Sequence, residues 1–218
     1  RSLPLFDWKV LLPGIDIGQF RAKYLNPAPG EALRLLCPDA ADCPEECHYR
    51  KVRELSSGLM ACCPLDITRP RIPVTPENIG IFRLNYARVH KEIADALGIE
   101  FSSVELDDAF FWELGCLKTG TGSRMPVYIS YYINTMVFEH RLENLLKEDR
   151  TFILLVGRLA DVPKAMLAAL RQKKCVCLGL DDCVSIAPDG SFAADGETVN
   201  LLNGIRSARQ QTALTEYQ

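Results

Sequence analysis

No apolar run in this chain approaches the length of a membrane-spanning helix. The N-terminal segment, RSLPLFDWKVLLPG, lacks the small-residue cleavage site of a signal peptide. The chain also begins without Met, so we expect the numbering to start inside a longer natural product. Together these absences predict a cytoplasmic protein with no membrane partner.

Several catalytic signatures are absent as well. The chain has no G-x-S-x-G elbow, no H-E-x-x-H helix and no G-x-G-x-x-G turn after a strand, and its three histidines are scattered. The segment Thr119–Arg124 (TGTGSR) has two glycines, but the lysine precedes them and no helix is expected to follow. We therefore interpret that segment as a hairpin turn and not as a phosphate loop. These absences favour a protein that is not an enzyme.

A strong charge of one sign is missing too. The formal net charge is −3 and the pI is near 5.7, so contact with a polyanion would need a local basic patch. The hydrophobic content of 48% and the charged content of 24% are typical of globular proteins. A chain of 218 residues is long enough for a small module beside a domain of ordinary size.

Cysteine, in contrast, is abundant. Nine cysteines are an odd number, which in a reducing compartment favours metal-binding thiolates and buried thiols over a disulfide framework. Four lie in or beside apolar runs and are expected to pack in the core: Cys116, Cys175, Cys177 and Cys183. The other five lie between Leu36 and Pro64 among Pro, Asp, Glu and Gly: Cys37, Cys43, Cys47, Cys62 and Cys63.

The spacing of those five cysteines predicts a metal site. Residues 48–55 and 59–61 are joined by Ser56-Ser57-Gly58, a composition typical of a tight hairpin turn. The hairpin would bring Cys47 close to Cys62 or Cys63, and the preceding loop would add Cys37 and Cys43. Four thiolates from a loop and a hairpin are typical of a structural zinc site of zinc-ribbon type.

Other interpretations of this cluster stay open. The x5 and x3 spacings differ from the paired C-x2-C knuckles of zinc ribbons, and an iron–sulfur cluster or free surface thiols are the alternatives. Cys62 and Cys63 would point to opposite faces of an extended segment, so only one of them is expected to bind the ion. His48 is a further candidate, but it follows Cys47 directly and would point away from it.

Two basic clusters flank the cysteines. Alternation along the first hairpin strand would place Lys51 and Arg53 on one face and Arg50 on the other. Nearby acids (Glu45, Glu46 and Glu54) reduce the local positive potential. The basic residues can therefore be interpreted as a solvated face, a protein-binding surface or a nucleic-acid-binding surface. The candidate nucleic-acid-binding residues are Arg50, Lys51, Arg53, Arg69 and Arg71.

The rest of the chain predicts a mixed α+β architecture. Residues 1–72 would hold an irregular lead-in over 1–36 and the zinc-ribbon-like module, 73–195 an α/β domain, and 196–218 a C-terminal helix and tail. Within the domain, a helix over Tyr86–Leu97 precedes three strands that form a meander. Two apolar strands, 151–156 and 175–180, flank a helix and predict a parallel βαβ unit in a mixed sheet.

This order of helix, three strands, helix, strand, helix, strand resembles the core of the restriction-endonuclease-like fold. The resemblance implies a Mg²⁺-dependent nuclease with an Asp near the second or third strand, and an acid followed two residues later by Lys on the third. The third strand expected here, MPVYISYY, has neither, and Lys118 lies five residues after Glu113. An inactive relative or an unrelated α/β sandwich therefore fits better than an active nuclease. The acids available nearby are Asp107, Asp108 and Glu113.

Asp181 and Asp182 follow a buried strand, a position where ligand sites occur in parallel sheets, although two turn aspartates are the simpler interpretation.

The sequence as a whole predicts a non-enzymatic, zinc-binding regulatory or adaptor protein that contacts nucleic acid or protein through a basic hairpin. A divergent metal-dependent nuclease or hydrolase is the alternative.

Overall fold

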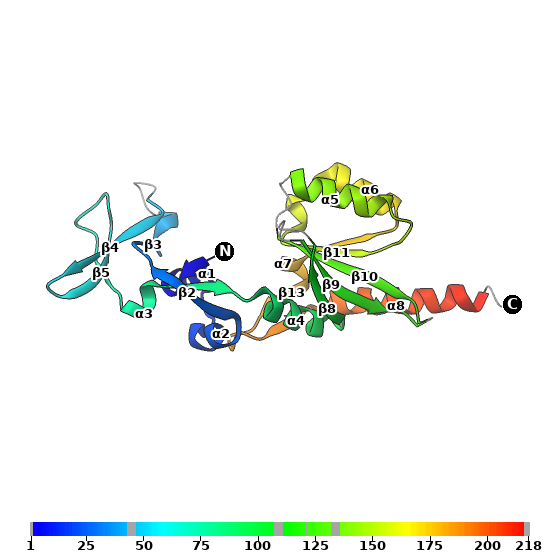
Figure 1. The fold of residues 1–218 in the computed structure, drawn as a ribbon, viewed down its shortest axis with the longest axis horizontal. Coiled ribbons are helices and arrows are strands. Elements are labelled where there is room, and N and C mark those ends of the chain that lie inside the picture. Colours follow the sequence, from blue (N-terminus) through cyan, green and yellow to red (C-terminus); the bar gives the residue numbers. More distant parts are fainter. Residues whose placement is uncertain (1, 43–46, 107–110, 121, 132–135, 216–218) are drawn as a thin grey trace. The chain divides into compact units, whose positions relative to one another are not determined.

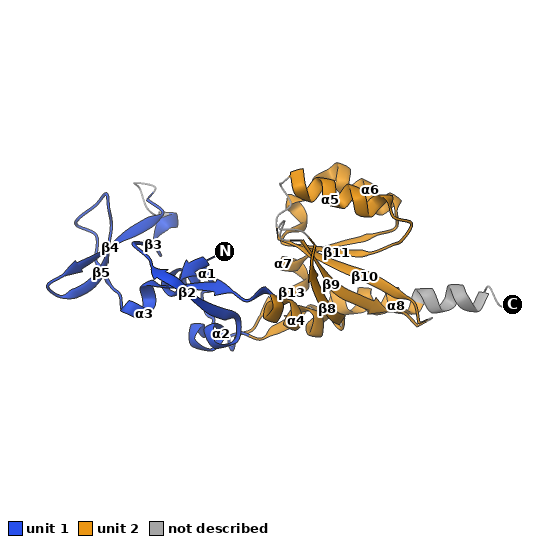
Figure 2. Ribbon diagram, viewed as in Figure 1, with its two compact units in different colours: residues 1–86, 188–190 blue, residues 87–187, 191–218 orange. Residues whose placement is uncertain are grey.

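The computed structural model describes residues 2–42, 47–106, 111–120, 122–131 and 136–215, with side chains except at 42 and 208–215. The chain forms two compact units (Figure 2). Unit 1 comprises residues 1–86 with Pro188–Gly190, and unit 2 comprises residues 87–187 and 191–218. Each unit has its own sheets, and the fold is mixed α+β (Figure 1).

The expectation of an irregular lead-in over residues 1–36 was wrong, because most of this segment is regular structure. A three-stranded antiparallel sheet has the order β1-β7-β2, with bounds Ser2–Pro4, Gly80–Leu84 and Leu25–Glu31. Between β1 and β2 lie α1 (Leu5–Leu11) and α2 (Ile17–Tyr24). The prolines of β2 indicated a loop in the sequence. β2 is an edge strand, however, and an edge strand tolerates residues that donate no backbone hydrogen bond.

The second sheet of unit 1 contains the expected hairpin. Its order is β3-β4-β5-β6, with bounds Arg34–Leu36, Tyr49–Leu55, Gly58–Cys62 and Ile72–Pro73. A short 3-10 turn, Ala40–Asp42, follows β3. One face of the sheet packs on a core that includes Leu35, Ala61, Val74 and Ile79. The short helix α3 (Pro76–Ile79) is capped by Thr75, whose side chain accepts a hydrogen bond from the Asn78 N–H.

Unit 2 is built on a mixed five-stranded sheet with the order β12-β11-β10-β9-β8. The meander is confirmed, since β8, β9 and β10 pair antiparallel, and so is the parallel β11-α6-β12 unit. The strand bounds are Glu100–Glu105, Phe111–Lys118, Arg124–Ser130, Ile153–Val156 and Val176–Gly179 for β8 to β12. The helices are α4 (Tyr86–Leu97), α5 (Met136–Lys147) and α6 (Lys164–Gln172).

Helices cover this sheet on both sides. In Figure 1, α5 and α6 lie over one face, and α4 lies on the opposite side. Under α5 and α6 an apolar cluster joins Phe111 and Tyr128 of the sheet to Phe138 and Leu142 of α5. A 3-10 turn (Leu159–Asp161), the short α7 (Leu180–Cys183), the hairpin β13–β14 (Val184–Ile186, Phe192–Ala194) and α8 (Gly196–Thr215) complete the described part of unit 2.

Candidate functional site: a cysteine pair, a cationic sheet face and a pocket

The hairpin brings two buried cysteines together in unit 1. Cys47 lies just before β4 and Cys63 just after β5, and their Sγ atoms are 3.7 Å apart. The backbone N–H of Asp66 donates to the Cys63 Sγ at 3.3 Å. Burial raises the pKa of Cys63, but hydrogen bonds from the Asp66 and Leu65 amides, the contact with Cys47 and the charge of Arg69 together leave the pKa below its usual value. The local environment therefore favours a thiolate at Cys63.

Cys37 has a different partner, the buried guanidinium of Arg50. Arg50 Nε donates to the Cys37 Sγ at 3.4 Å, Nη1 to the Pro70 carbonyl at 2.6 Å and Nη2 to Asp39 Oδ2 at 2.9 Å. The Arg50 side chain is 2% exposed, so it cannot belong to a surface that contacts a ligand. Its alternation with Lys51 was expected, but its hydrogen bonds that join β4 to residues 37–39 and to Pro70 were not.

The remaining cysteines of the predicted metal site separate into two cases. Cys62 pairs with Lys51 across β4 and β5 and is half-buried, on the opposite side of the strand from Cys63. Cys43 lies outside the described residues. Within the described ranges, no three Cys, His, Asp or Glu side chains are arranged to hold a metal ion. The Cys47–Cys63 pair is thus the part of the expected four-thiolate set that the structure brings together.

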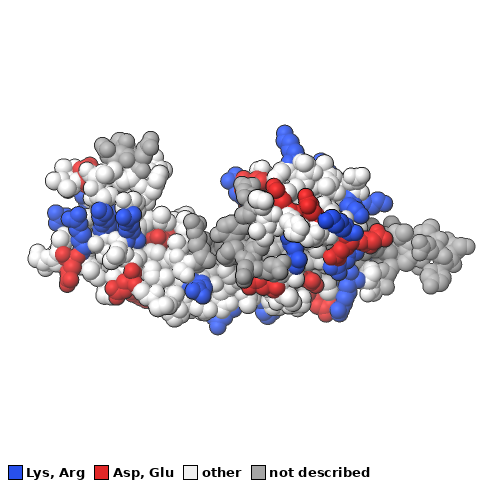
Figure 3. Space-filling model, turned by 45° about the horizontal axis from the view of Figure 1, so that its top comes forward, with Lys and Arg blue, Asp and Glu red and all other residues white. Residues whose placement is uncertain are grey.

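The solvent-facing side of the β3–β6 sheet is basic. Arg34 and Lys51 are directly paired on β3 and β4, and Arg53 follows two residues later on the same side. Arg71, one residue before β6, alternates to that side as well. We call these four exposed residues the cationic face: Arg34, Lys51, Arg53 and Arg71. Figure 3 shows Lys and Arg side chains gathered in a row on unit 1.

Among the described strand residues, no acid shares the side of the cationic face. The strand residues that share its side are apolar, aromatic or small, because Glu54 alternates to the other side. In the part of the chain that the structure describes, none of the four cations forms an ion pair. Arg34 stacks on the Tyr49 ring at 4.6 Å, whereas Arg69 is drawn to Asp66 at 3.8 Å. Arg34 was missed in the sequence because the register that pairs it with Lys51 joins segments far apart in the chain.

The acidic candidates of unit 2 form no paired-carboxylate site among the described residues. Asp107 and Asp108 lie outside those residues. Glu113 on β9 pairs across strands with Tyr128 of β10, so its direct neighbour on that strand is an aromatic residue and not a second carboxylate. Asp181 and Asp182 lie in α7, where Asp181 is 3.8 Å from Arg158.

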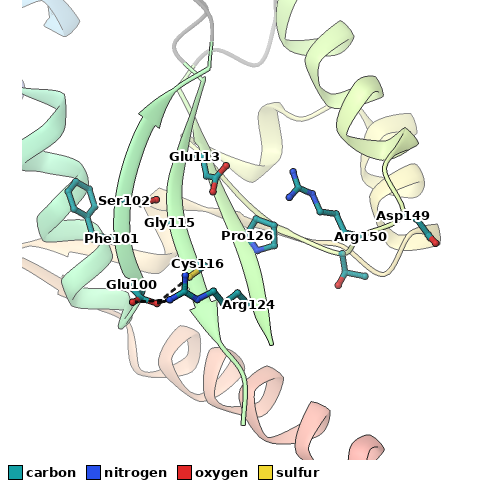
Figure 4. Close-up of a pocket in the computed structure, with 11 residues that line it drawn as sticks. Glu100, Phe101, Ser102, Glu113, Gly115, Cys116, Arg124, Pro126, Asp149 and Arg150 are labelled. Atoms are coloured by element: carbon teal, nitrogen blue, oxygen red, sulfur yellow. Dashed lines mark hydrogen bonds and ion pairs between the residues drawn. The ribbon is translucent and has the colours of Figure 1, made fainter. Parts of the chain in front are cut away.

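A pocket of about 640 Å³ surrounds Glu113. It is lined by β8, β9 and β10 and by the loop between α5 and β11 (Figure 4). Glu100 accepts from Lys118 at 3.3 Å and is 3.2 Å from Arg124, and these cations with Cys116 hold the pKa of Glu100 below its ordinary value. Arg150 donates to the Tyr128 hydroxyl at 2.9 Å and contacts Glu148 at 2.5 Å.

Comparisons with protein-family models, with curated proteins and with solved structures found no match. None of the helices in the described ranges combines the length and the apolar character needed to cross a membrane.

Proposed function

We propose that this protein binds the phosphate backbone of nucleic acid through the cationic face of unit 1, and that it does so without catalysis. The observation that carries the proposal is the cross-strand grouping of Arg34, Lys51, Arg53 and Arg71 on one side of a sheet whose described strand residues include no acid on that side. The net charge of −3 makes this local concentration of cations more informative.

The geometry of the face suits a phosphate chain. Residues on neighbouring strands are about 4.8 Å apart, and residues two apart along a strand are separated by about 6.7 Å. Cations at such intervals can each contact a different phosphate. Because none of the four is held by a carboxylate of the described residues, binding a phosphate breaks no existing ion pair.

We further propose that Cys47 and Cys63 bind a structural zinc ion that fixes the ends of the hairpin carrying this face. Tetrahedral zinc with bonds of about 2.3 Å separates its sulfur ligands by about 3.8 Å. The Sγ separation of 3.7 Å is close to that edge, and the lowered pKa of Cys63 favours the ligating form. The remaining ligands are expected from the preceding loop, as the spacing of Cys37 and Cys43 predicted. The contact of Cys37 with Arg50 makes Cys43 the stronger candidate.

Backbone binding is tested by fluorescence anisotropy with a labelled single strand and its duplex across a salt series. The double variant Lys51→Glu, Arg53→Glu should weaken binding by at least ~10-fold at low salt. The slope of log K against log salt should fall by about 0.7 to 0.9 for each phosphate contact that is lost.

A matched control separates the cationic face from net charge. Lys9→Glu with Arg83→Glu makes the same charge change at exposed positions of unit 1 outside this sheet, and it should leave affinity almost unchanged. Equal losses in the two double variants, or no binding by the unmodified protein at low salt, would contradict the proposal.

The zinc site is tested by elemental analysis of the whole protein purified without chelator. About one equivalent of zinc is expected, lost in Cys47→Ser and in Cys63→Ser. Cys62→Ser is the matched control, because its side chain points to the other side of the strand. A metal-free protein, or loss of metal in the Cys62 variant alone, would show that the pair is not a zinc site.

A further inference from the structure

The pocket of unit 2 occupies a part of the sheet that the helices leave open. The face that carries Phe111 and Tyr128 is covered by α5, and the same face continues toward Cys116 and Arg124 as the pocket floor. All of its lining residues belong to unit 2, so the pocket is independent of the cationic face.

The pocket floor is shaped by two irregularities in the strands. The pairing of β9 shifts beside β8 between Phe101 and Val104, and beside β10 between Val127 and Tyr128. Between these shifts lies Gly115, with φ of +151°, where a Cβ atom would be 2.0 Å from the Glu100 carbonyl oxygen. Only glycine fits there, and bulges of this kind redirect the side chains beside them.

The two ends of the pocket carry opposite charge. Figure 4 shows Glu113 near Arg150 toward one end and Glu100 near Arg124 toward the other. At the first end Arg150 is already bound by Glu148 and donates to the Tyr128 hydroxyl, and no described residue forms an ion pair with Glu113. At the second end Lys118 and Arg124 share the single carboxylate of Glu100. Among the described residues, the pocket therefore offers the unpaired carboxylate of Glu113 at one end and the cation Arg124 at the other.

Glu113 is the half-buried acid of this pocket that still needs a partner. Among the residues that the structure describes, none forms a hydrogen bond or ion pair with its carboxylate, whereas Glu100 has two cationic partners. A half-buried carboxylate gains most from a ligand that presents adjacent N–H donors to its two oxygens.

The distance between the ends sets the length of the ligand. Glu113 pairs with Tyr128, and Arg124 lies four residues away along β10, a separation of about 13 Å between backbone positions. A free amino acid is too short to reach both ends. A nucleotide has the required length, and guanine is the nucleobase whose Watson–Crick edge offers two adjacent N–H donors to one carboxylate.

We propose that this pocket binds a guanine nucleotide, with the base edge on Glu113, the base against the ring of Pro126 and the phosphate toward Arg124. The guanine belongs either to a free nucleotide or to a single strand of nucleic acid, and the two sources share this chemistry. The assignment does not depend on backbone binding by unit 1.

Isothermal titration of the whole protein with GMP and AMP tests whether the pocket prefers guanine to adenine. Titration with two short oligonucleotides that differ by one guanine-to-adenine change tests the same preference within a single strand. Saturable binding that prefers guanine is expected, and Glu113→Gln should weaken it by ~10- to 100-fold, because an amide replaces one acceptor oxygen with a donor. The control Glu105→Gln, on β8 but outside the pocket, should bind as the unmodified protein does.

Binding of GMP identifies a free nucleotide as a sufficient ligand, and binding of the guanine oligonucleotide alone identifies a strand. The double variant Lys51→Glu, Arg53→Glu keeps the preference for guanine, which separates this pocket from the cationic face. The proposal is overturned if neither guanine ligand saturates the protein, if AMP binds as tightly as GMP, or if Glu113→Gln and Glu105→Gln have the same effect.

Discussion

At the scale of single residues, Arg50 differs from its basic neighbours because its three contacts replace water. Its guanidinium donates to a sulfur and a carboxylate of the segment 37–39 and to the carbonyl of Pro70. Five N–H donors in a rigid plane allow this, whereas a lysine ammonium is a single point of charge. Arg50 therefore contributes to the stability of unit 1 and not to its surface.

Arg50→Lys should lower the free energy of unfolding of unit 1 by about 2–4 kcal/mol, because two of the three acceptors lose their donor. Arg53→Lys, at an exposed position of the same strand, should change it by less than about 0.5 kcal/mol. Urea unfolding followed by the fluorescence of Trp8, in a Trp112→Phe background, measures both. Equal effects of the two changes would show that the contacts of Arg50 add nothing.

His90 makes the free energy of unfolding of unit 2 depend on pH. Its buried ring lies 4.9 Å from Trp112, and burial lowers its pKa from 6.5 to about 4. The folded state therefore binds the proton more weakly than the unfolded state. The stability that neutral His90 contributes is fully present above pH 6.5 and is lost as the pH falls toward 4. The loss should reach about 3 kcal/mol, at 1.36 kcal/mol per pKa unit.

Two measurements check the behaviour of His90. The free energy of unfolding of unit 2, followed by Trp112 fluorescence, should fall between pH 6.5 and 4. In NMR spectra, the imidazole proton signals of His90 should not shift between pH 7.5 and 5.5. A midpoint for His90 near 6.5 would contradict a buried neutral ring.

At the scale of elements, β9 depends on one glycine. Gly115→Ala would place a methyl group against the backbone of β8 and force a φ that alanine avoids. We expect a loss of at least about 3 kcal/mol in the stability of unit 2, or no folded protein. Gly157→Ala, with no atom within 4 Å of the added carbon, is the matched control and should be close to neutral. Thermal unfolding of both variants compares them directly.

At the scale of the whole molecule, the two tryptophans report the two units separately. Trp8 belongs to unit 1 and Trp112 to unit 2. If zinc is bound by Cys47 and Cys63, a strong chelator should lower the melting temperature that Trp8 reports in the Trp112→Phe protein. The melting temperature that Trp112 reports in the Trp8→Phe protein should stay the same. Equal decreases in the two melting temperatures would show that the metal is not bound at this pair. No change in either would show that no structural metal is bound.

Local patterns in the sequence predicted much of the fold. The hairpin around Ser56-Ser57-Gly58, the helix over Tyr86–Leu97 and the βαβ unit all follow from short-range periodicity and turn chemistry. The first sheet of unit 1 did not, because β7 pairs with β1 and β2 from the far side of the whole β3–β6 sheet in the sequence and β2 contains two prolines. Pairing over such distances leaves little signal in either segment alone.

The sequence by itself determined which side chains are available: thiols beside a hairpin, cations that alternate along its first strand, and acids near the meander. Tertiary structure decided which of them meet. It placed Cys63, and not Cys62, beside Cys47, buried Arg50 among three acceptors, added Arg34 to the cationic face and left Glu113 facing a pocket. The physical reason is that register and burial depend on which strands pair, and those pairings join distant parts of the chain.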